Sequence, residues 1–186
     1  MTLTATNLMT AEMLEVMPHD GRRLELIRGE LKEHMPTGYQ HGVYTHRLSQ
    51  RLGVFVDDHH LGEVCAAETG FIVDRHPDTV RAPDLAFVAK ERIEELGERP
   101  KGFLPIAPDL VAETISPFDL YSESHEKALM WLEFGVRVVL LLDPRKANIT
   151  IYRSKKDIAV LESGDMLEFD DVVSGFRISV ARIFKV

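Results

Sequence analysis

The sequence predicts a mixed α/β domain, and three observations carry that prediction. Residues 109–115 and 138–142 are short, largely apolar runs of the kind expected for strands buried on both faces. Residues 122–134, between them, have helical periodicity and are followed by Gly135, a typical helix terminator. Residues 158–178 contain short strand-like segments, so strands and helices are mixed along the chain.

Local signals predict the elements of the first half. A helix is expected where apolar residues recur every three or four positions, and a strand where they alternate or cluster. These criteria predict a helix over residues 10–17 capped by Thr10, a β-hairpin over 24–33 turning near Gly29, a helix over about 40–58, and strands over 63–73 and 84–88.

The same criteria predict the elements of the second half of the chain. They predict a short helix over 90–96, a loop over 97–105, a strand over 109–115, a helix over 122–134 capped by Ser122 or Ser124, strands over 138–142 and 149–152, and a last helical turn over 181–184. Trp131 is expected in the core. The layout is a mixed central sheet flanked by helices, with extra β-hairpins.

Length and composition set the class of protein. The 186 residues fit one domain, which we expect to span 1–186. No apolar stretch approaches the roughly 20 residues of a membrane helix, and residues 1–6 lack the basic and apolar regions of a secretory signal. Cys65 is the single cysteine, which excludes an intramolecular disulfide, so we expect a cytoplasmic protein without a membrane partner.

The charge balance argues against bulk electrostatic binding of nucleic acid. Thirty acidic residues against 22 basic ones give a formal net charge of −8, whereas phosphate binding needs a local density of lysine and arginine. The basic pairs at 22–23, 145–146 and 155–156 lie at predicted turns and are expected to be solvated charges. An enzyme whose acidic residues bind a metal ion is still compatible with this balance.

Several common catalytic motifs are missing from the sequence. It contains no glycine-rich phosphate loop, no Gly-x-Ser-x-Gly elbow and no dinucleotide fingerprint. His125-Glu126 is not part of a zincin motif, because position 129 is leucine. These absences disfavour an NTPase, an α/β hydrolase, a dehydrogenase and a zincin.

Two carboxylates occupy unusual places. Glu113 lies within an apolar strand, and Asp84 follows Pro83 at the start of another. A buried carboxylate needs a cation or a metal ion. For Glu113 taken alone, a structural ion pair is as good an explanation as a functional site. For Asp84 taken alone, a turn or the start of a strand is a better explanation than a functional site. Together, on adjacent strands, the two carboxylates predict a site for Mg²⁺ or Mn²⁺, which take oxygen ligands.

An ordered set of motifs resembles a known family. The set comprises 24–31 (LELIRGEL), His41, 81–88 (RAPDLAFV), 108–117 (PDLVAETISP), Lys127 and 142–144 (LDP). It resembles the Uma2 family, which is assigned to the PD-(D/E)xK, restriction-endonuclease-like superfamily of nucleases. The resemblance spans nearly the whole chain and implies a restriction-endonuclease-like fold.

The resemblance also implies site residues. Asp84 corresponds to the aspartate of the motif and Glu113 to its second acidic residue, and both would bind the metal ion. The superfamily lysine would stand at 115, where this chain has Ile115. Uma2 proteins take the lysine from the following helix, and Lys127 matches. On spacing alone, Lys127 would be a solvated charge.

Two further residues are candidates by resemblance. His41 would contact substrate phosphate or assist proton transfer, although a helix-terminus or core histidine is an equal alternative. Glu30 would face the metal pocket, or else be an exposed hairpin charge, and Glu25 is a weaker candidate of the same kind.

The implied activity is metal-dependent endonucleolytic hydrolysis of nucleic acid, with DNA as the expected substrate and a homodimer as the expected assembly. One alternative is a binding or regulatory homodimer on the same fold that does not cleave, motivated by the charge of −8 and by Ile115. A third hypothesis is a metal-dependent hydrolase of a small phosphate ester.

Overall fold

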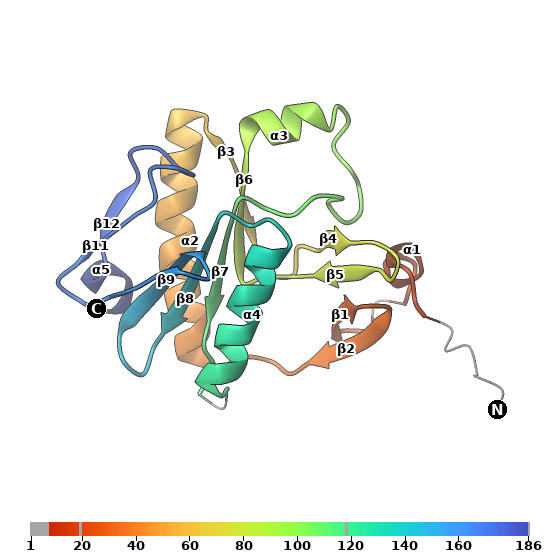
Figure 1. Cartoon of the computed structure of the whole chain (residues 1–186), viewed down its shortest axis with the longest axis horizontal. Helices are drawn as coiled ribbons and strands as arrows, with labels where there is room; N and C mark the ends of the chain where they lie inside the picture. The colour runs from red at the N-terminus through yellow and green to blue at the C-terminus, as the bar shows by residue number, and fades with distance from the viewer. Residues whose placement is uncertain (1–7, 19, 118, 186) are drawn as a thin grey trace.

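Three β-sheets and the helices packed on them make up the described chain (Figure 1). The computed structural model describes residues 8–18, 20–117 and 119–185. Its elements, in chain order, are α1 (Ala11–Glu15), β1 (Arg23–Ile27), β2 (Glu30–His34), α2 (Tyr39–His59), β3 (Gly62–Ala66), β4 (Phe71–Asp74), β5 (Thr79–Arg81), β6 (Leu85–Ala89), α3 (Lys90–Glu95), β7 (Leu110–Thr114), α4 (Tyr121–Glu133), β8 (Val138–Asp143), β9 (Asn148–Ser154), β10 (Asp157–Leu161), β11 (Met166–Glu168), β12 (Arg177–Ser179) and α5 (Ala181–Phe184).

The central sheet is mixed, as the sequence predicts. Its strand order is β10-β9-β8-β7-β6-β3. β7 and β8 are parallel and are joined through α4, whereas the other described neighbours are antiparallel. A parallel pair needs a crossover connection, and α4 supplies it.

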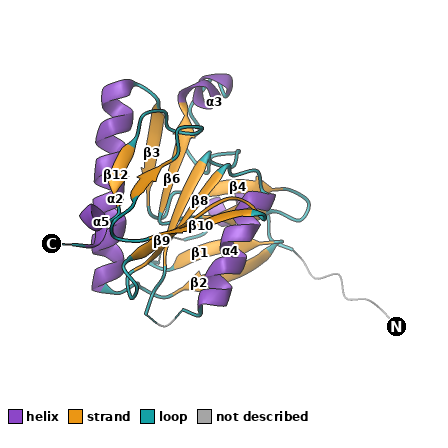
Figure 2. Ribbon diagram, turned by 60° about the vertical axis from the view of Figure 1, so that its left-hand side comes forward, coloured by secondary structure: helices purple, strands orange, loops and turns teal. Residues whose placement is uncertain are grey.

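The two faces of this sheet carry different helices (Figure 2). Leu110 and Ala112 of β7 pack with Leu48 and Leu52 of α2. Val111, between them, packs with the α4 side chains, Trp131 included. Because strand side chains alternate, Glu113 must share the α4 face with Val111.

The second sheet is antiparallel, with the order β2-β1-β5-β4, and it packs against α1. The predicted hairpin is confirmed: Arg28 and Gly29 both have positive φ, 50° and 79°, as a type I′ turn requires. The predicted cap of α1 is also confirmed, because the Thr10 hydroxyl accepts a hydrogen bond from the Met13 amide.

The single strand predicted over residues 63–73 is wrong. β3 belongs to the central sheet and β4 to the second sheet, and the chain turns between them. Glu68 has a φ of 71°, and a Cβ at Gly70 would lie 2.2 Å from Cδ1 of Phe103, so close packing fixes the turn. β5 is a strand that the sequence did not predict.

The N-terminus of α4 also differs from expectation. The helix begins at Tyr121, after Leu120, whose side chain cannot accept a hydrogen bond. The Ser124 hydroxyl instead donates to the carbonyl of Leu120. The core position of Trp131 is confirmed, since the residue is fully buried. Within the described residues, no helix combines the length and the apolar character needed to cross a lipid bilayer.

Candidate active site

Asp84 lies where the chain passes from the second sheet, at β5, to the central sheet, at β6. It is 7% exposed. Its Oδ2 accepts a hydrogen bond of 2.8 Å from the backbone amide of Thr114 on β7. Nε2 of His41, in the first turn of α2, lies 2.9 Å from the same oxygen. Contacts from two other elements, β7 and α2, therefore hold this carboxylate in place.

Glu113 lies on β7 and points to α4. Its Oε1 accepts a hydrogen bond of 2.9 Å from Nε1 of Trp131. Nζ of Lys127 lies 2.8 Å from the same oxygen. Lys127 and Trp131 are four residues apart, so one face of α4 presents both donors. The amine of Lys127 thus reaches the carboxylate, as the resemblance implies.

Neighbouring charges, that of His41 included, affect the ionisation of Asp84, Glu113 and Lys127. Burial opposes ionisation of Asp84, but the hydrogen bond and the charge of His41, together with the Thr114 amide, lower its pKa. Burial raises the pKa of Glu113, against the charge of Lys127, and the negative charges of Asp84 and Glu25 add to the rise. Burial opposes the charge of Lys127, but Glu113 and Glu25 raise its pKa, so the ammonium form is favoured.

A second buried cluster adjoins the first. Oε2 of Glu25, on β1, lies 2.7 Å from Nε2 of His34 and 3.2 Å from NH1 of Arg81. Its Oε1 accepts a hydrogen bond of 2.8 Å from the Ala82 amide. Burial would raise the pKa of Glu25, but His34, the charge of Lys127 and Arg81 outweigh burial and lower it to about 2.

Because the pKa of Glu25 is lowered in the folded protein, the free energy of unfolding should decrease as the pH falls into the acidic range. A carboxylate whose pKa is lower in the folded state stabilises the fold above its unfolded pKa of 4.5, and that contribution is lost as the pH falls towards 2. The contribution at neutral pH is on the order of 3 kcal/mol.

We expect Glu25→Gln to be clearly less stable than wild type at pH 7 and nearly equal to it at about pH 2, as measured by urea unfolding. A constant difference across this range would contradict the pairing. Glu33→Gln, on the exposed face of β2, should behave as wild type at every pH.

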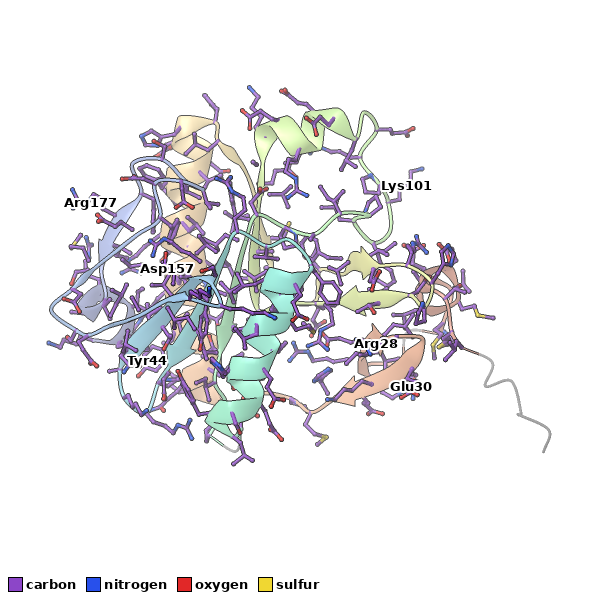
Figure 3. The ribbon with its side chains drawn as sticks, viewed as in Figure 1. Arg28, Glu30, Tyr44, Lys101, Asp157 and Arg177 are labelled. Atoms are coloured by element: carbon purple, nitrogen blue, oxygen red, sulfur yellow. The ribbon has the colours of Figure 1, made fainter. Side chains whose placement is uncertain are left out.

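The structure does not bring Glu30 to these clusters. It pairs with Ile27 at the turn end of the hairpin and is exposed (Figure 3). Among the described residues that line the pocket, Glu30 is absent and Glu25 is present. Glu25 lies three positions along β1 from the turn, beside the β5–β6 connection, so the hairpin register selects it.

One pocket contains both clusters. It has a volume of about 800 Å³ and lies between the two larger sheets. Polar residues nearer the surface, such as Asp20, Arg22 and Glu68, line it together with six titratable side chains of the two clusters: Glu25, His34, His41, Asp84, Glu113 and Lys127. Five of the six candidates that the sequence indicates, the weaker candidate Glu25 included, therefore line one cavity.

Comparison with known proteins shows the family. The model of the Uma2 family, described as putative restriction endonuclease, matches residues 11–181. The chain belongs to the Uma2 family. The resemblance recognised in the sequence is thereby confirmed.

The fold of this Uma2 protein has a solved counterpart. A putative nuclease belonging to DUF820 from Anabaena variabilis is similar to it, with a TM-score of 0.79 over 95% of this chain and 97% of that chain. The identity is 23%, so this likeness shows the fold. No curated protein matches the sequence.

The oxygen donors of the Uma2 pocket fit a divalent ion that needs few protein ligands. Among the described residues, no group of three or more His, Cys, Asp and Glu side chains is arranged to hold a metal. Mg²⁺ commonly binds through one or two carboxylates and completes its shell with water and substrate phosphate. Asp84 and Glu113 are two carboxylates that line one pocket. Burial raises the pKa of Glu113 and the negative charge of Asp84 adds to the rise, so a cation bound beside them would relieve their repulsion.

Sequence reasoning missed several residues that shape the Uma2 pocket. His34, Arg81 and Trp131 were not expected to touch acidic site residues. Arg81 carried a usable signal, because an arginine beside the apolar segment 84–88 is rarely buried without an acidic partner. Trp131 carried none, because a tryptophan in an apolar helix face indicates only the core.

Trp131→Phe tests the hydrogen bond to Glu113. Removing the indole N–H and shrinking the ring should lower the free energy of unfolding by about 2 kcal/mol or more. Since Trp131 is the single tryptophan, urea unfolding must be followed by circular dichroism. Tyr39→Phe, at an 86% exposed site, should be neutral. Equal stability of both variants would show that the indole contact contributes nothing.

Proposed function

We propose that this protein is a metal-dependent endonuclease that hydrolyses phosphodiester bonds of nucleic acid, with DNA as the expected substrate. The observation that carries the proposal is the meeting of Asp84, Glu113, Lys127 and His41 in one pocket. Membership in the Uma2 family, described as putative restriction endonuclease, supports the same activity.

The residues divide the work by their chemistry. Asp84 and Glu113 would hold Mg²⁺ or Mn²⁺. The bound ion would polarise a phosphoryl oxygen and lower the pKa of a water molecule. Lys127 presents a cation beside Glu113, where it can orient the attacking oxygen and stabilise the negative charge that develops on the phosphate. His41 fixes the orientation of Asp84 and can contact the substrate phosphate.

The test of this proposal is cleavage of DNA and RNA oligonucleotides by the purified protein. We expect cleavage with Mg²⁺ or Mn²⁺ and none in EDTA. Calorimetry should also show binding of Mn²⁺ to the folded protein. A folded sample that binds Mn²⁺ and cuts only a generic phosphodiester would favour a small phosphate ester as substrate.

The non-cleaving homodimer is the second candidate, favoured by the net charge of −8. The presence of Ile115 at the position of the superfamily lysine also favours this candidate. That argument is weakened because Lys127 brings an amine from α4 to Glu113. A folded sample that gives no heat with Mn²⁺ and cuts no substrate would favour this candidate over the enzyme. By family resemblance we also propose a homodimer located in the cytoplasm, which light scattering and cell fractionation would test.

A further inference from the structure

The pocket has an apolar wall in addition to its polar floor. The wall consists of Leu14 and Met17, at and just after α1, Leu24 of β1, and Phe103 from the loop after α3. Leu14 is buried and the other three are half-buried. The nuclease chemistry proposed above uses none of these side chains.

The pocket follows the edge of β1. Arg23, Leu24 and Glu25 are consecutive, yet all three line it. Successive strand side chains point to opposite faces, so a cavity that touches all three must run along the strand edge. β1 pairs with β5 at Leu26 and Val80, and the edge before Leu26 borders the pocket. The apolar wall and the polar floor are therefore parts of one elongated cavity.

Access to the carboxylates is narrow. Asp84 and Glu113 are each 7% exposed. The loops that carry Gly38 and Pro117 both line the pocket, and a Cβ at Gly38 would lie 4.0 Å from Cδ of Pro117. A base-paired duplex is stiff, and two approaching loops hinder its entry. An unpaired strand can bend into the cavity.

The charge at the mouth also disfavours a duplex. Arg22 lies 2.7 Å from Asp20, and Arg23 lies 3.2 Å from Glu68, so acidic partners neutralise both arginines. With a net charge of −8, affinity from release of counterions is small. An apolar wall offers affinity of another kind, because unpaired bases can pack on aromatic and apolar side chains. A volume of about 800 Å³ lies in the range, about 300–1,000 Å³, of pockets that enclose a small organic ligand.

We propose that the pocket takes an unpaired nucleotide, so that the substrate is single-stranded nucleic acid or an unpaired segment of a duplex. One base packs on Phe103 and its apolar neighbours, and the adjoining phosphate reaches Asp84 and Glu113. This inference rests on the proposed nuclease function and specifies its substrate class.

The experiment compares three labelled DNA probes of the same sequence: a single strand, a fully paired duplex, and a duplex with an internal unpaired segment. With wild-type protein and Mn²⁺, we expect kcat/KM at least about tenfold higher for the first and third probes, with cuts in or beside the unpaired segment. Equal or faster cutting of the paired duplex overturns the inference and leaves the nuclease function intact.

If no probe is cut, the nuclease proposal fails, and binding decides the inference. Fluorescence anisotropy with wild-type protein in Mg²⁺ should then show at least tenfold tighter binding of the single strand than of the duplex. Equal affinity, or no binding of any probe, overturns the inference.

Phe103→Ala tests the wall directly. Base packing on an aromatic side chain contributes about 1–3 kcal/mol, which is roughly a 5- to 150-fold effect. We expect KM for the single strand to rise at least about fivefold with little change in kcat. Phe55→Ala, at a half-buried position of α2 outside the described pocket lining, should leave KM unchanged. Equal effects of the two variants, in samples shown to be folded, would contradict the assignment of the wall.

Discussion

Replacing Asp84 by asparagine should lower the rate of Mn²⁺-dependent cleavage by about 10³-fold or more. The substitution keeps the shape of the side chain but removes the charge of one of the two proposed metal ligands. Stabilisation of transition-state charge by a metal ion contributes several kcal/mol, and each 1.36 kcal/mol corresponds to about tenfold in rate. Glu113→Gln should have an effect of similar size for the same reason.

The measurement pairs initial cleavage rates with calorimetric binding of Mn²⁺. Both variants should lose binding as well as cleavage, while circular dichroism shows a folded protein. Asp157→Asn is the matched control, because Asp157 lies on the exposed edge strand β10 (Figure 3). It should cut and bind as wild type does. If the three variants and wild type all cleave equally, the assignment of the metal ligands is refuted.

Much of the central sheet could be predicted because its signals are local. The apolar runs of β7 and β8, and the periodic helix between them, identify a strand–helix–strand unit from sequence alone. The same local patterns assign Glu113 to a strand and Lys127 to the helix that follows it. They do not show that the two side chains touch, since that depends on the rotation of α4 over the sheet. The 2.8 Å contact of Lys127 with Glu113 is therefore information that the fold adds.

Beyond its β1–β2 hairpin, the second sheet was not predicted from the sequence, because the contacts that assemble it are not local. Residues 63–73 have the composition of one strand, but the chain changes sheets at Gly70, which packs against Phe103 some thirty positions later. The choice of Glu25 over Glu30 has the same origin. Both are acidic residues of one hairpin, and the placement of that hairpin beside the β5–β6 connection decides which carboxylate meets Arg81.

Lys127→Met should separate catalysis from metal binding. The variant keeps the aliphatic stem of the side chain and removes the ammonium group beside Glu113. Loss of one group that stabilises developing charge commonly lowers kcat by about 10²–10³-fold. We expect a loss of this size in single-turnover cleavage with saturating Mn²⁺.

Binding of Mn²⁺ should persist in Lys127→Met, because the amine is not a ligand and its positive charge repels a cation. This pattern differs from that of Asp84→Asn, in which binding and cleavage are lost together. Lys155→Met is the control. Lys155 forms an exposed ion pair with Glu133, the last residue of α4, and such pairs contribute little. It should retain both activities. A Lys127→Met protein that cleaves at the wild-type rate would show that the ammonium group only balances the charge of Glu113, and the amine would then have no part in the reaction.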